Sequence, residues 1–133
     1  MRLADVQFTH RDQIVVAGVT GEIDLSNTAG IERVIAEAMT NEQLALILDL
    51  SQVDYLDSAG IQLLYQLRER LRVRSQVLRL VIPASSLANH ALKLAGISRH
   101  IDTSETVEDA TREAHHELDG TSEASGFPDR SVD

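Results

Sequence analysis

The chain has 133 residues, of which 43% are hydrophobic, and a formal net charge of -9 at pH 7. This length predicts one domain, and the scarcity of aromatic residues, with no Trp, predicts an aliphatic core. The negative charge argues against nucleic acid as a partner. The absence of cysteine excludes disulfides and thiolate chemistry. No segment approaches the ~18 continuous apolar residues of a membrane span, so we expect a soluble cytoplasmic protein without membrane insertion.

The first part of the chain predicts two strands and a helix. Residues 6–10 are a weak candidate for an edge strand, and residues 13–20 are a stronger one because of their valines. Residues 21–24, GEID, predict an acidic turn. Ser26 or Asn27 is expected to cap the helix that follows. Its apolar residues recur at helical spacing and share one face: Ile31, Val34, Ile35, Ala38 and Met39.

The central part predicts a buried strand followed by a helix. Residues 44–48, LALIL, are an unbroken apolar run, which is typical of a strand covered by helices on both faces. After a short loop, residues 58–74 predict a helix with Ile61, Leu64, Leu67 and Leu71 on one face. Arginines 68, 70, 72 and 74 crowd its C-terminal half, where positive charge complements the helix dipole. Residues 77–82 predict a third strand.

The remaining chain predicts two more helices and a tail. Ser85 or Ser86 can cap a helix with Leu87, Ala91 and Leu94 inward, and Gly96 suits its C-terminal cap. Residues 100–103 are a candidate short strand. Residues 106–118 predict a helix that buries Val107, Ala110 and Ala114. Residues 119–133 lack periodicity, which predicts a disordered acidic tail.

Strands that alternate with helices predict an α/β fold. We expect one domain over residues 1–118, with a mixed β-sheet of about four or five strands and about four α-helices. At least one parallel crossover is expected, between the strands at 44–48 and 77–82.

Residues 57–60, Asp-Ser-Ala-Gly, place one small hydroxyl at the first turn of the central helix, where backbone N–H groups lack intrahelical partners. Either Asp57 or Ser58 can act only as an N-terminal cap, which stabilises by about 1 kcal/mol. Alternatively, Ser58 accepts a phosphate, because a helix N-terminus favours negative charge and the small neighbours leave the hydroxyl reachable. The residue pattern leaves both interpretations open.

Residues 46–64, LILDLSQVDYLDSAGIQLL, resemble the signature of the STAS domain, and specifically that of the bacterial anti-sigma factor antagonists. Three other stretches agree with that family in order and spacing: the acidic turn at 21–24, LKLAGI at 92–97 and the start of the last helix at 104–110. The similarity extends from about residue 6 to residue 118.

The resemblance implies a protein that is not an enzyme and needs no cofactor. In that family the unmodified antagonist binds a partner that is both serine kinase and anti-sigma factor, so that sigma factor is released for transcription, as in stress responses. Phosphorylation of the serine ends this binding, and a metal-dependent serine phosphatase restores it. On this chain the resemblance implies Ser58 as the acceptor, Gly60 as the residue that keeps the approach to it open, and a partner-binding surface made of Asp24, Asp57, Ser58, Ala59, Gly60 and Ile61.

Two other functions fit parts of the pattern. The first alternative is a STAS interaction subunit of a membrane transport or signalling scaffold complex, without a phosphorylation cycle. The second is a small hydrolase that uses either the acidic residues Asp49, Asp54 and Asp57 or Ser58 as nucleophile with His90 or His100 as base. The chain lacks the Gly-x-Ser-x-Gly elbow.

No metal site is predicted. Asp49, Asp54 and Asp57 suggest a divalent-cation cluster, but a solvated loop is expected because no His or second acidic motif lies nearby. His115 and His116 are adjacent, and adjacent residues do not share a helix face. The arginines between 68 and 74 can bind phosphate or lipid, although we expect a solvated helix end.

Overall fold

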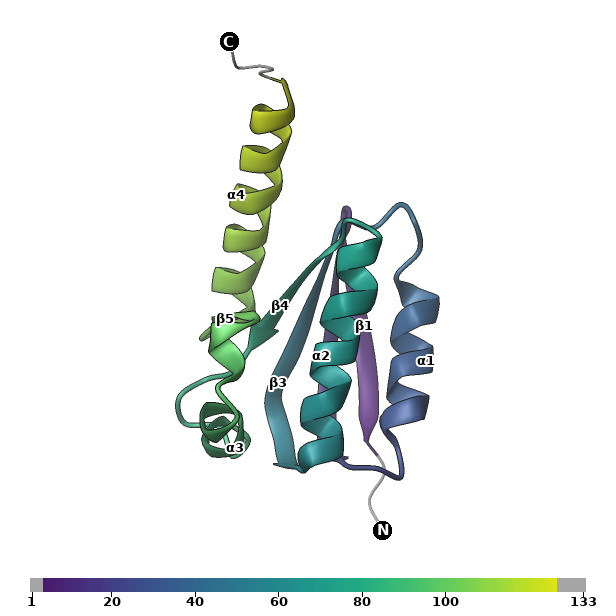
Figure 1. The fold of residues 1–133 in the computed structure, drawn as a ribbon, viewed down its shortest axis with the longest axis vertical. Helices are drawn as coiled ribbons and strands as arrows, with labels where there is room; N and C mark the ends of the chain where they lie inside the picture. Colours follow the sequence, from purple (N-terminus) through teal and green to yellow (C-terminus); the bar gives the residue numbers. More distant parts are fainter. Residues whose placement is uncertain (1–3, 127–133) are drawn as a thin grey trace.

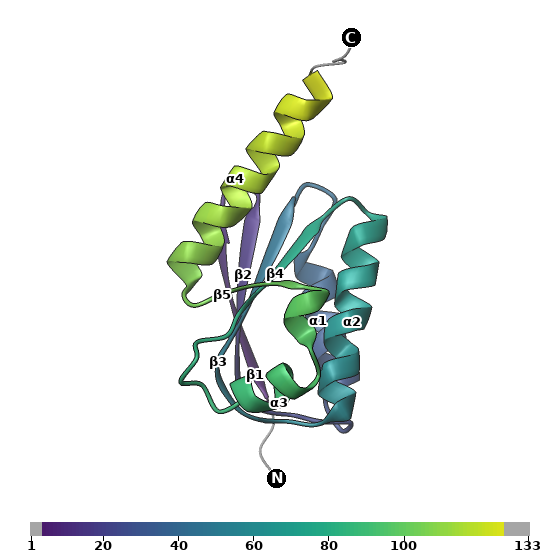
Figure 2. The same cartoon turned by 60° about the vertical axis from the view of Figure 1, so that its left-hand side comes forward.

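The computed structural model describes residues 4–126, which form a five-stranded sheet with helices on both faces (Figures 1 and 2). The strands are β1 (Asp5–Arg11), β2 (Ile14–Ile23), β3 (Ala45–Leu56), β4 (Val77–Val81) and β5 (Asp102–Ser104), and their order in the sheet is their order in the chain. The pair β1–β2 is antiparallel and the other pairs are parallel. The predicted mixed α/β sheet with a parallel crossover into β4 is therefore confirmed.

Three helices lie on one face of the sheet: α1 (Thr28–Ala38), α2 (Ser58–Val73) and α3 (Asn89–Leu94). The fourth, α4 (Val107–Gly126), crosses the opposite face and projects beyond the sheet (Figure 2). A short 3₁₀ helix, Ile97–Arg99, follows α3, and Gly96 between them has the left-handed φ of 68° that the expected C-terminal cap requires.

The larger core lies between the sheet and the helices α1, α2 and α3. It contains the residues expected on the faces of the first two helices, among them Ile31, Ile35, Leu64, Leu67 and Leu71. Two details differ from the pattern: Leu63 is buried, and Ile61 is only half-buried. The strand β3 contributes Leu46, Leu48 and Leu50 to this side and Ala45 and Ile47 to the other, as expected of a strand covered on both faces.

Helix α4 packs against the sheet through small side chains and one nearly buried cation. Ala110 and Ala114 are fully buried, as predicted. Beside them Arg79, on β4, keeps only 11% of its side chain exposed. Its guanidinium lies 2.8 Å from Glu113 and 3.5 Å from Glu117, both on α4, and 3.4 Å from Asp102 on β5. This cation therefore ties three elements together.

Two strands are longer than the sequence pattern predicts. β2 continues through Gly21 and Glu22 to Ile23, so only Asp24 of the predicted acidic turn lies outside the strand. β3 continues to Leu56 through residues that were expected to form a loop. The reason is that the two strands pair with each other across two irregularities, which lets Val53, Leu56 and Ile23 reach the core.

The prediction of which side chains of α3 point inward is wrong. Leu87 and Leu94 are 71% and 76% exposed, whereas Ala88 and Leu92 are buried. The segment carries two apolar stripes at helical spacing, and the path of the chain between β4 and β5 turns the smaller one toward the core.

The last helix is also longer than predicted, because α4 continues past Leu118 to Gly126. Proline, which stops a helix, does not occur in this stretch before position 128. The first part of the predicted tail, residues 119–126, continues this helix, and its remainder, residues 127–133, lies outside the described residues. Within residues 4–126 no helix is long and apolar enough to cross a membrane.

We expect Arg79→Met to lower the free energy of unfolding by about 1–3 kcal/mol, because the carboxylates around a nearly buried cation lose their partner. The measurement is urea unfolding, with hydrogen exchange to show that α4 loosens first. The matched control is Arg72→Met, which breaks only an exposed ion pair with Glu69 and should leave stability unchanged. Equal losses in the two variants would contradict this role of Arg79.

Candidate functional site

The predicted site lies where the parallel strands β2 and β3 end side by side. Ile23, the last residue of β2, is in register with Leu56, the last residue of β3. Asp24 and Asp57 follow at equivalent positions, and the Asp57 N–H donates to the Ile23 carbonyl at 3.3 Å. The helices α1 and α2 begin at this same edge of the sheet (Figure 1).

Asp57 is the N-terminal cap of α2. Its backbone is extended, and its Oδ1 accepts a hydrogen bond of 3.1 Å from the Gly60 N–H. Its carbonyl accepts the first helical bond, from the Ile61 N–H, also at 3.1 Å. Such a cap stabilises by about 1 kcal/mol. The structure thus assigns the cap to the aspartate rather than to the serine.

Ser58 is the first residue of α2, and it is exposed. Within the described residues its hydroxyl makes no hydrogen bond. Because Asp57 already satisfies the Gly60 N–H, the cap does not need the Ser58 side chain. A side chain that is exposed and unbonded at a helix N-terminus can accept a new group without breaking a contact.

Gly60, which the resemblance implies keeps the approach to Ser58 open, is itself buried. A Cβ at this position would lie 2.8 Å from Leu56 Cγ and 3.1 Å from Ile23 Cγ2. The absence of a side chain therefore lets α2 approach the ends of β2 and β3. Ala59, which is half-buried, is the small neighbour that borders the hydroxyl on the surface.

Asp24 lies at the same edge but is bound within its own loop. Its Oδ1 accepts from the Ser26 N–H at 2.9 Å and from the Ser26 hydroxyl at 2.5 Å. Asn27 has the N-cap position of α1, yet its side chain accepts from the Asp24 N–H and donates to the Glu22 carbonyl instead. These bonds hold the Asp24 carboxylate close to the end of β3 with a fixed orientation.

The other polar residues that the sequence suggested as a metal site or as a catalytic base do not come together in the described residues. Asp49 lies within β3, where its Oδ1 accepts from the Ser51 N–H at 3.0 Å. The His100 ring packs edge-on against Tyr65, with the ring centres 5.6 Å apart. In residues 4–126 no group of three or more His, Asp or Glu side chains could hold a metal ion. Within the described residues no hydrogen bond joins the Ser58 hydroxyl to His90, His100 or a carboxylate.

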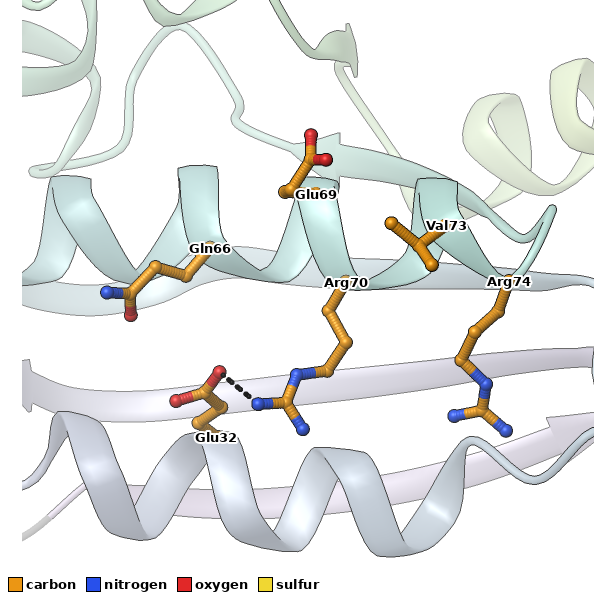
Figure 3. A pocket seen from close by; sticks show the side chains of 6 residues that line it. All are labelled: Glu32, Gln66, Glu69, Arg70, Val73 and Arg74. Carbon is orange, nitrogen blue, oxygen red and sulfur yellow. Dashed lines mark ion pairs between the residues drawn. The ribbon is translucent and has the colours of Figure 1, made fainter.

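A hollow lies elsewhere, between α1 and α2. It has a volume of about 580 Å³ and is lined by Glu32, Gln66, Glu69, Arg70, Val73 and Arg74 (Figure 3). Figure 3 shows Arg70 reaching across to Glu32, and the ion pair measures 3.3 Å. The side-chain hydrogen bond from Arg72 lowers the pKa of the Glu69 carboxyl. Three of the predicted arginines thus bind neighbouring groups, since Arg74 also donates to the Met39 carbonyl.

Comparison with known proteins agrees with this architecture. Residues 5–110 match the sequence model of the STAS domain. The anti-sigma-F factor antagonist RsfB of Mycobacterium tuberculosis is 30% identical over 97 residues, which are 73% of this chain and 78% of that protein. An anti-sigma factor antagonist from Mycobacterium paratuberculosis has a similar crystal structure, with a TM-score of 0.72 at 24% identity over 85% of this chain and 95% of that chain. The Bacillus cell fate determinant SpoIIAA in its phosphorylated form superposes with a TM-score of 0.62 at 19% identity over 82% of this chain and 98% of that chain.

The mixed sheet, with helices on both faces and α2 starting beside the paired ends of β2 and β3, defines a SpoIIAA-like α/β domain. The chain belongs to the STAS domain family, and the relative that it matches at 30% identity is an anti-sigma-F factor antagonist. The resemblance seen in residues 46–64 is thereby confirmed.

Sequence reasoning missed the exposed apolar residues at this edge. Leu25 follows Asp24 and is 79% exposed, and Tyr55, near the end of β3, is 51% exposed. Leu25 belongs to none of the periodic apolar stretches of the sequence. This is the one feature from which its exposure could have been predicted. Tyr55 carried no such signal, because its exposure depends on how far β3 extends.

We expect Gly60→Ala to lower the free energy of unfolding by about 1–3 kcal/mol, because the new methyl group overlaps Leu56 and moves the start of α2. Gly30→Ala in α1 is the matched control. A Cβ there meets nothing within 4 Å, so alanine should stabilise the helix by about 0.5–1 kcal/mol. Chemical denaturation of both variants tests this, and a neutral Gly60→Ala would mean that the approach of α2 is not constrained.

Proposed function

We propose that this chain is an anti-sigma factor antagonist whose binding to an anti-sigma factor is switched off by phosphorylation of Ser58. The partner is both the anti-sigma factor and the serine kinase, and the chain itself catalyses nothing. The observation that carries the proposal is the division between Asp57, which caps α2, and Ser58, whose exposed hydroxyl is left unbonded. The likeness to a named antagonist at 30% identity supports it.

The first turn of α2 tolerates a phosphate. A helix N-terminus carries partial positive charge, so it stabilises an anion there. The added charge of about -1.5 to -2 changes the surface without a new fold. Asp57 and Asp24 already make this edge negative. The phosphate adds to this negative charge at the surface that the partner contacts.

The partner is expected to present positive charge at this edge. A kinase holds the phosphates of ATP with cationic groups, and a chain with a net charge of -9 approaches such a site favourably. Once the antagonist is docked, a new phosphate is buried in the interface without a matching cation, which is costly. A loss of about 1.4 kcal/mol already weakens binding tenfold.

The contact surface that we propose contains Asp24, Asp57, Ser58, Ala59 and Ile61. Gly60 supports it from below by fixing the position of α2. A metal-dependent serine phosphatase is the counterpart that would reset the switch, and both reactions would take place in the cytoplasm.

We expect a kinase-type anti-sigma factor that binds this chain, supplied with Mg²⁺ and ATP, to add one phosphate at Ser58. Intact-mass measurement and fragment mapping check this. The control variant is Ser58→Ala, which should gain no mass. If no such kinase modifies the chain, or if the phosphate lies on another serine such as Ser26, the switch does not work as proposed. An interaction subunit without a phosphorylation cycle would show that result while still binding its partner.

We expect Ser58→Ala to bind the anti-sigma factor like the unmodified chain and Ser58→Asp to bind about tenfold more weakly, because only the second adds charge to the interface. Calorimetric titration measures the two affinities. Ser75→Asp is the matched control, since it adds the same charge on an exposed residue just past the other end of α2, at a φ of 60° that aspartate tolerates. Equal affinities for Ser58→Ala and Ser58→Asp would exclude the electrostatic mechanism.

A further inference from the structure

Large apolar side chains gather at one edge of this molecule. Among the described residues, five are more than half exposed: Leu25, Tyr55, Val73, Leu87 and Leu94. Single exposed apolar residues are ordinary on protein surfaces. Four of these five lie near the carboxyl ends of parallel strands: Leu25 follows β2, Tyr55 is next to last in β3, and Leu87 and Leu94 lie in the segment after β4. Val73 lies at the far end of α2.

Two of them lie on the segment of α3. Leu87 is in the turn before the helix, two residues ahead of Asn89, and Leu94 is the last residue of the helix. Ala88 and Leu92, which lie between them in the sequence, are buried instead. We call Leu87 and Leu94 the α3 leucine face. The core does not need these side chains, since they are 71% and 76% exposed.

The α3 leucine face lies at the same edge as Ser58. Both views of the ribbon show α3 at the end of the sheet where α2 begins (Figures 1 and 2). The chain path explains this, because α3 follows the carboxyl end of β4 as α2 follows that of β3, and the two strands are parallel neighbours.

The two parts of this edge differ in charge. Asp24 and Asp57 lie around Ser58, whereas the chain from residue 82 to residue 101 contains no acidic residue and carries Lys93 within α3. One carboxylate, that of Glu105, borders this segment and accepts from the Ala84 N–H at 3.2 Å. Phosphate at Ser58 therefore adds negative charge to a part that is already negative, and it leaves the apolar part unchanged.

We propose that the kinase that modifies Ser58 docks on both parts of this edge, with the α3 leucine face as an apolar anchor that phosphorylation does not remove. This inference rests on the proposed function, and it adds which surface the partner covers. A stable interface covers about 800 Å² on each partner, far more than the residues around one serine. A kinase centred on Ser58 must therefore cover neighbouring surface, and α3 supplies the exposed apolar side chains that interface cores favour.

The partner then needs an apolar patch beside its nucleotide site. The phosphate weakens the contact around Ser58 and leaves the contact with the α3 leucine face unchanged. The phosphorylated chain should therefore keep residual affinity through α3, which would allow it to be held loosely rather than released completely.

The test compares the double variant Leu87→Ser/Leu94→Ser with Val73→Ser, which removes an equally exposed side chain, 70% exposed, at the far end of α2. Each is titrated against the kinase-type anti-sigma factor that binds the wild-type chain, and the rate of Ser58 phosphorylation is measured at limiting kinase. We expect the double variant to bind on the order of tenfold more weakly and to be phosphorylated more slowly, and Val73→Ser to match wild type. Thermal unfolding verifies that all variants keep the native fold.

Combination with Ser58→Asp separates the two parts of the surface. If they act independently, the losses in binding free energy add, and the triple variant loses the residual affinity of Ser58→Asp. A double variant that binds and is phosphorylated like wild type would overturn the inference and leave the proposed function intact. A change in the dimerisation of this chain alone, without a change in kinase binding, would also overturn it, because the face would then serve a second copy. If the wild-type chain is neither bound nor phosphorylated, the proposed function fails and the inference fails with it.

Discussion

The geometry of the site depends on how closely the first turn of α2 approaches the paired ends of β2 and β3. Only a hydrogen fits at Gly60, because a Cβ would lie 2.8 Å from Leu56 Cγ and 3.1 Å from Ile23 Cγ2. Leu56 and Ile23 are neighbours across the parallel pair, so one contact fixes both the start of α2 and its position beside the loop of Asp24. A serine at the beginning of this helix consequently stands on a rigid base, and the proposed phosphate at this position would change the surface rather than the fold.

Two adjacent residues divide the structural and the chemical roles. Asp57 turns its carboxylate inward to the Gly60 N–H and holds the helix end, while Ser58 turns outward with its hydroxyl unbonded. If the serine capped the helix, phosphorylation would have to break the cap. With the aspartate in that role, the helix end would stay intact whether or not Ser58 carries a phosphate. In the proposed switch, the new charge would then cost free energy only when a partner covers it.

The two ends of the sheet differ in the side chains that border them. At the end away from Ser58, the Gln76 side chain is buried and donates to the Thr40 and Gln43 carbonyls at 2.9 and 2.8 Å, and Arg74 donates to the Met39 carbonyl at 3.1 Å. These bonds fasten the loop after α1 to the region after α2. On the opposite face Arg79 fastens α4 to β4 and β5. The Ser58 edge instead displays exposed leucines and a tyrosine, together with the Asp57 cap and the close packing at Gly60.

The sequence by itself determined the order of the elements, the faces of α1, α2 and α4, and the position of Ser58 at the start of a helix. These features follow from local periodicity and from residue types at a helix end, which need no knowledge of distant contacts. The tertiary structure decided the rest. β2 and β3 extend as far as each finds a partner in the other, and this pairing is not local. Around α3 two apolar stripes compete, Leu87 with Leu94 and Ala88 with Leu92, and only packing chooses which is buried. Backbone geometry likewise chose Asp57 over Ser58 as the cap, because both residue types suit that position and only the chain's direction on leaving β3 distinguishes them.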